Sequence, residues 1–145
     1  TSLWTAAGGT LLQRIGGPRA VHNAVVSSYD LLLARPDFAR FFLACPLKMG
    51  RIRSGIGMFM ETLFSNPANC DMAELDQRHR SLDITDGLFS DFIDTIVEAF
   101  HSEGNRQANG EDIFEIQQSL ETLRSSITSG HRSRLATAQA NNTKS

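Results

Sequence analysis

The stretch MAELDQRHRSL (residues 72–82) carries a histidine where a helix usually has a core residue. Met72, Leu75, His79 and Leu82 are spaced by 3, 4 and 3 residues, which places them on one face of an α-helix. A histidine on such a face needs a hydrogen bond, a charged partner or a metal, because burying it alone is costly. From this spacing, a core histidine with a satisfied hydrogen bond is the commoner outcome, and a ligand of a metal or haem iron is the alternative.

The rest of the chain also repeats with the helical period. Its most regular segment runs from Met49 to Leu63, with Ile52, Ile56 and Phe59 on the same apolar face. Further helical segments are predicted at 11–15, 18–35, around His79, from the cap residue Thr85 to Phe100, and at 113–127, with a compact aromatic segment at 36–42. The sequence therefore predicts an all-α domain of about six helices.

The C-terminal end has a different composition from the rest. Gly130 is typical of a helix stop, and His131 to Ser145 contain almost no apolar residues. We therefore expect one domain over residues 1–130, followed by a polar, disordered tail over residues 131–145.

Two glycines interrupt the apolar helix between Met49 and Leu63. Gly55 and Gly57 each lower helix stability by about 1 kcal/mol relative to alanine, so their presence needs a reason. One interpretation is that a neighbouring helix crosses closely at this point. The other is that a flat ligand lies against this face.

The composition excludes several classes of protein. A net charge of −2 provides no basic surface for nucleic acid or anionic lipid. The apolar runs are too short for a membrane span, and no secretory signal is visible. Cys45 and Cys70 lack the spacing of a zinc site, and we interpret them as reduced thiols of a cytoplasmic protein.

A set of features along the chain resembles one family, the truncated haemoglobins, and most closely their group I. Gly16-Gly17 is similar to the glycine pair between the family's first two helices, and Tyr29 falls where the family has a distal tyrosine. Phe41-Phe42 matches an aromatic pair whose second member packs on the haem. His79 opens the segment HRSLDIT, with Phe89 ten residues on, which is similar to the proximal histidine segment. The resemblance covers Leu11 to Ile127.

This resemblance implies a truncated two-on-two helical sandwich around a haem, with haem b as the cofactor. His79 would be the ligand of the iron, and Tyr29 the hydrogen-bond donor on the distal side. A haem also needs an apolar slot. We expect it to be built from Phe42, Ile52, Ile56, Phe59, Leu75, Leu82, Ile84 and Phe92.

The chain departs from the group I pattern in several places. Ile56 stands where many members have a glutamine that assists the tyrosine, and Ile52 makes the distal side more apolar still. Residues 65–67 replace an expected glycine pair, whereas Phe92, a tryptophan in groups II and III, favours group I. Gly55 stands where a basic residue often meets a haem propionate. The residues that could replace it are Arg51, Arg53, Arg78 and Arg80.

The implied function is reversible binding of a diatomic gas, O₂ and also NO or CO, with oxygen binding or transport as the role. One alternative is dioxygenation of NO, which would need an external reductase because the chain has no flavin or nicotinamide fingerprint. Another is a haem-free globin fold used as a sensor or interaction module, suggested by the loss of polar distal residues. No residue of the chain itself is assigned a catalytic role.

Overall fold

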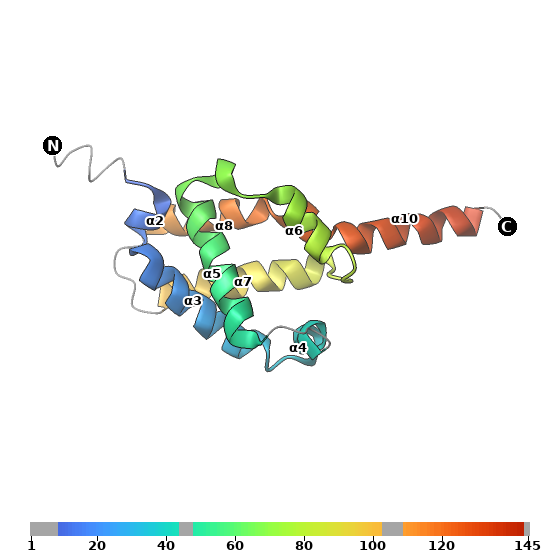
Figure 1. The fold of residues 1–145 in the computed structure, drawn as a ribbon, viewed down its shortest axis with the longest axis horizontal. Coiled ribbons are helices and arrows are strands. Elements are labelled where there is room, and N and C mark those ends of the chain that lie inside the picture. Colours follow the sequence, from blue (N-terminus) through green and yellow to red (C-terminus); the bar gives the residue numbers. More distant parts are fainter. Residues whose placement is uncertain (1–8, 44–47, 103–108, 144–145) are drawn as a thin grey trace.

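The computed structural model describes residues 9–43, 48–102 and 109–143, and these are almost entirely helical (Figure 1). The helices are α2 (Leu11–Arg14), α3 (Gly17–Leu32), α4 (Pro36–Leu43), α5 (Met49–Ser65), α6 (Met72–His79), α7 (Asp86–Ser102), α8 (Gly110–Glu121), α9 (Arg124–Ile127) and α10 (Ser129–Thr143), with a short 3₁₀ turn, η1 (Pro67–Asn69). No strand occurs among the described residues. The predicted all-α fold is confirmed. Cys45 lies outside the described residues, and Cys70 is a free thiol.

The hydrophobic core lies where α3 packs against α5 and α7, and where α7 packs against α8. These contacts bury the apolar faces that the sequence predicts. The fully buried side chains include Val21, Val25, Ile93, Ile96, Phe100, Ile116 and Leu120. No described helix is long and apolar enough to cross a membrane.

Local sequence sets where the main helices begin. Gly16 and Gly17 adopt φ angles of 112° and 80°, the left-handed region that favours glycine, and so turn the chain from α2 into α3. Pro18 then occupies the first turn of α3, where its missing N–H has no helical partner to lose. Thr85 caps α7 as predicted, since its Oγ1 accepts a hydrogen bond from the backbone N–H of Leu88 at 3.1 Å.

The last predicted helix, 113–127, is interrupted in the structure. It consists of α8 and α9, separated by Thr122 and Leu123. The Thr122 hydroxyl donates to the carbonyl of Ser119 at 2.6 Å, and the Leu123 N–H bonds to the carbonyl of Leu120 at 3.0 Å. Such hydrogen bonds to the carbonyl three residues earlier tighten the chain and end the regular α-helix.

The largest difference between the sequence prediction and the structure is at the C-terminal end, where the sequence predicts a disordered tail. Residues 129–143 form α10, and Gly130 lies within it as a buried residue instead of ending a helix. Figure 1 shows α10 extending away from the other helices toward the C-terminal end. Its first turns are held by polar contacts with the segment after α6, including His131 Nδ1 with Asp83 Oδ1 at 2.7 Å. Hydrophobic periodicity cannot predict a helix that is anchored in this way.

Gly55 and Gly57 are not sites of close helix crossing. A methyl group added at either position would meet no heavy atom within 4 Å, apart from the helix's own nearby backbone. The interpretation that a neighbouring helix crosses closely there is therefore wrong. The interpretation with a flat ligand stays a prediction.

Candidate functional site

His79 is the last residue of α6, and its ring is anchored to the helix that carries it. The Nδ1–H donates to the backbone carbonyl of Leu75, with 2.7 Å between nitrogen and oxygen. Within the described part of the chain, the other ring nitrogen, Nε2, has no hydrogen-bond partner. Burial lowers the pKa of His79 below its ordinary value, which favours the neutral ring.

This geometry is compatible with both roles that the sequence left open for His79. A satisfied core histidine and a metal ligand both donate one ring N–H to a backbone carbonyl. Only the ligand also needs a neutral ring with a free lone pair on the second nitrogen. His79 meets that requirement through Nε2.

Tyr29 is buried on α3, with 6% of its surface exposed, and its ring contacts the aromatic rings of two neighbours. The ring centre of Phe42 lies 5.9 Å away and that of Phe92 lies 6.2 Å away, both with their planes steeply inclined to Tyr29. Among the described residues, the Tyr29 hydroxyl has no hydrogen-bond partner. Burial raises the pKa of this phenol, so it keeps its proton and stays a donor.

The structure brings most of the predicted slot residues to the edge of one core. Those half-buried against it are Phe42, Ile56, Phe59, Leu75, Ile84 and Phe92. Ile52 and Leu82 are also half-buried. These side chains come from α4, α5, α6, α7 and the segments between α6 and α7. Together with Tyr29 they supply an apolar environment that includes a single phenolic donor.

Sequence reasoning did not assign some residues to this region. Phe89 stacks on Phe92, with ring centres 5.8 Å apart and planes inclined by 19°. The position of Phe89 in the segment that begins at His79 is a sequence signal that points to this region. Met49 and Met72 also pack at this core, and both lie on the apolar helical faces that the sequence shows. The carbonyl of Leu75 has no sequence signal, because a backbone group is the same in every residue.

Three of the four arginines proposed for the haem propionates have acidic partners. Arg78 pairs with Glu74 at 2.7 Å and Arg80 with Asp76 at 3.1 Å, both within the α6 region. Arg53 lies 3.7 Å from Asp30, and its Nε is buried without a hydrogen bond. Arg51 is exposed and makes no ion pair within the described residues.

The residues present fit a haem better than a bare metal ion. A protein-bound zinc or similar ion needs three or four ligands from the chain. Here the donor is one imidazole nitrogen beside apolar side chains, which is the combination that a haem needs, because the macrocycle supplies the remaining ligands. The unpartnered hydroxyl of Tyr29 adds a donor within the same apolar environment.

Comparisons with known proteins identify the family and the fold. A model of the bacterial-like globin family matches residues 10–129. Two structures of truncated hemoglobin from Tetrahymena pyriformis, both Fe(III) forms of point mutants, each match with a TM-score of 0.68 and 19% identity, over 81% of this chain and 97% of theirs. At this identity the likeness shows the fold alone, and no curated protein matches. Because the family model covers most of the chain, the protein belongs to the bacterial-like globin family, a family of haem proteins.

Proposed function

We propose that the protein binds haem b through His79 and reversibly binds a diatomic gas. The haem supplies an iron that takes O₂, NO or CO as a ligand. The observation that carries this proposal is the anchored ring of His79, with Nδ1 bonded to the Leu75 carbonyl at 2.7 Å and Nε2 without a partner among the described residues. The hydrogen bond fixes the orientation of the ring and increases the basicity of the second nitrogen.

Tyr29 would be the donor that selects among gases. A phenol that keeps its proton favours ligands that accumulate negative charge, such as O₂, and does little for CO. Ile52 and Ile56 carry no polar group, so they exclude water and offer no second donor. This composition supports Tyr29 acting alone. Its ring, held between Phe42 and Phe92, would keep the hydroxyl in place.

The test is the visible absorption spectrum of the purified protein with added haemin, recorded in the ferric form, after dithionite, and after CO. We expect a Soret band that shifts sharply on CO binding. The variant His79→Gly is expected to lose stable haem and to regain it in part with added imidazole. His22→Gly, at an exposed position on α3, is the control.

The outcomes separate the hypotheses. Full retention of haem with an unaltered spectrum in His79→Gly would remove this residue from the role of iron ligand. A low-spin ferrous spectrum before CO is added would indicate a second internal ligand. No Soret shift with haemin would favour the haem-free module.

A further inference from the structure

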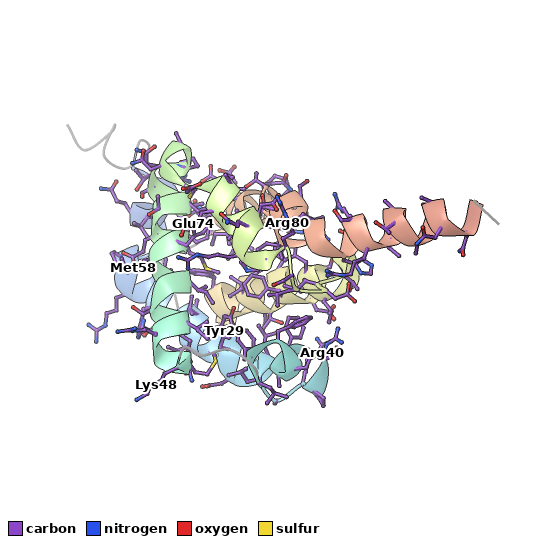
Figure 2. The ribbon with its side chains drawn as sticks, turned by 45° about the vertical axis from the view of Figure 1, so that its right-hand side comes forward. Tyr29, Arg40, Lys48, Met58, Glu74 and Arg80 are labelled. Atoms are coloured by element: carbon purple, nitrogen blue, oxygen red, sulfur yellow. The ribbon has the colours of Figure 1, made fainter. Side chains whose placement is uncertain are left out.

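The C-terminal helix α10 lies almost entirely beyond the part of the chain that matches the globin family. That match ends at residue 129, whereas α10 spans Ser129–Thr143. The helix packs against α6 and α9. In Figure 2, Arg80, which follows the proposed haem ligand directly, lies beside the start of α10. An element added to the family domain therefore contacts the segment that carries His79.

The closest approach is made by Gly130. It is buried, and a methyl group added there would overlap the carbonyl oxygen of Arg80 and lie 2.7 Å from that of Leu82. Both neighbours are backbone atoms, which cannot rotate away as a side chain does. The first turn of α10 therefore lies directly against the turn that follows His79.

Arg134 binds the same turn through its guanidinium group. It donates to the carbonyl of Leu82, to that of Arg80 at 3.4 Å, and to the carboxylate of Asp83 at 3.3 Å. The last carbonyls of a helix have no partner within it, and they carry partial negative charge. Arg134 thus supplies from α10 hydrogen-bond donors to two carbonyls of the turn that follows α6.

Further contacts hold the two segments on either side of this turn. The Ser129 hydroxyl donates to Asp76 at 3.0 Å, one turn before His79. His131 Nδ1 lies 2.7 Å from Asp83, after the turn. The first turns of α10 therefore contact the chain both before and after His79.

Helix α6 packs against α9 as well as against α10. None of its residues is fully buried, and only some of its apolar side chains, such as Leu75, pack at the edge of the core. We infer that Gly130 and Arg134 are positioning residues, through which α10 sets the placement of His79 relative to its iron. This inference rests on the proposed function, because it needs His79 to be the ligand.

The test uses two variants of the full chain, each with a matched control. Gly130→Ala forces the turn and α10 apart, and Arg134→Gln removes the donors and the charge. Gly110→Ala adds the same methyl group in open space, and Arg19→Gln removes a charge from an exposed position without a partner among the described residues. Arg134→Gln decides the matter if Gly130→Ala fails to fold.

Two readouts are needed. In the haem-free protein, hydrogen exchange of residues 72–82 should accelerate about tenfold in both variants, equivalent to about 1.4 kcal/mol. In the ferrous haem-loaded protein, resonance Raman spectroscopy should show a shifted or broadened iron–histidine stretching band. The two controls should match the parent in both measurements.

The results distinguish two kinds of failure. If the parent lacks the iron–histidine band, or His79→Gly keeps it, the proposed function itself fails. If the band is present in the parent and absent in His79→Gly, but unchanged in Gly130→Ala and Arg134→Gln, the positioning role of α10 is overturned. Faster exchange in α6 with an unchanged band has the same meaning, because α10 would then support the helix without setting its ligand.

Discussion

At the scale of single residues, Tyr29 has the sharpest expected effect on gas binding. Replacing it by phenylalanine removes one hydroxyl and keeps the ring contacts with Phe42 and Phe92. A neutral hydrogen bond contributes about 1 kcal/mol, and somewhat more to a polarised acceptor, so the O₂ dissociation rate of Tyr29→Phe should rise about five- to thirtyfold. Stopped-flow replacement of O₂ by CO measures this rate.

The CO dissociation rate is the internal control for Tyr29→Phe, because CO gains little from a hydrogen-bond donor. It should change much less than the O₂ rate. An unchanged O₂ rate would mean that the hydroxyl does not reach the ligand, and Tyr29 would then be a core tyrosine.

Residue patterns and backbone geometry contribute differently to this site. The sequence points to His79 because a histidine on an apolar helical face is unusual. It points to Tyr29 because this single tyrosine lies in a segment that resembles the family's distal segment. The carbonyl of Leu75 that anchors the histidine is a backbone group and leaves no such mark. The partners of the arginines also depend on the fold, since Arg53 meets Asp30 from another helix.

At the scale of elements, the glycines of α5 provide a test of what lies against that helix. A methyl group at Gly55 meets no neighbour within 4 Å, and its φ is not positive. Alanine loses less conformational freedom on folding than glycine does. Gly55→Ala should therefore raise the free energy of unfolding of the haem-free protein by about 0.5–1 kcal/mol, measured by urea denaturation.

Gly17→Ala is the matched control for Gly55→Ala. Its φ of 80° makes a side chain unfavourable, so the same substitution should lower stability. If Gly55→Ala stabilises the haem-free protein but speeds loss of haem, a flat ligand against this face is supported. A destabilised haem-free protein would contradict the open space found at this position.

The contact between α10 and the turn after α6 predicts a dependence on pH. The hydrogen bond with His131, helped by Arg134, holds the pKa of Asp83 below its ordinary value. A carboxylate with a lowered folded pKa stabilises the fold above its unfolded pKa, and this stabilisation is lost as the pH falls through the folded pKa. Asp83→Asn should therefore lower the midpoint of thermal unfolding at neutral pH, and the difference from the parent should disappear as the pH falls through the lowered folded pKa of Asp83.

The control for Asp83→Asn is Asp94→Asn on α7. Asp94 is exposed and has no partner within the described residues. Its removal should change the unfolding midpoint little at any pH. A difference for Asp83→Asn that persists at low pH would show that the carboxylate charge is not what holds α10.

The elements that the sequence missed share a physical cause. Apolar periodicity predicts α3, α5 and α7 because each buries an apolar face against a neighbour. By contrast, α10 lacks such a face, and its anchors are polar side chains that meet residues about 50 positions earlier. The break between α8 and α9 is accompanied by local hydrogen bonds of Thr122 and Leu123, which a pattern of apolar residues does not predict.

At the scale of the whole molecule, the core and the proposed haem ligand are separate. The core joins α3, α5, α7 and α8, and its fully buried residues include none from α6. This separation explains why apolar patterns in the sequence predict the fold. The site, in contrast, depends on a few side chains at the edge of the core. We therefore expect the protein to stay folded when the His79 side chain is removed.

The variant His79→Ala tests this separation. In the haem-free protein it removes one half-buried ring and one hydrogen bond at a helix end, so the free energy of unfolding should fall by no more than about 1 kcal/mol. Haem binds only the folded state and should stabilise the parent by about 4 kcal/mol when its free concentration is a thousand times the Kd. Most of that gain should be absent in His79→Ala.

Thermal unfolding of the parent and of His79→Ala, each with and without haemin, measures both quantities in one series. His101→Ala, exposed near the end of α7, is the control and should gain the full stabilisation from haemin. A haem-free His79→Ala protein that is strongly destabilised, with an undiminished gain from haemin, would restore the other interpretation of the sequence. His79 would then be a core histidine satisfied by the carbonyl of Leu75, and the iron would need a different ligand.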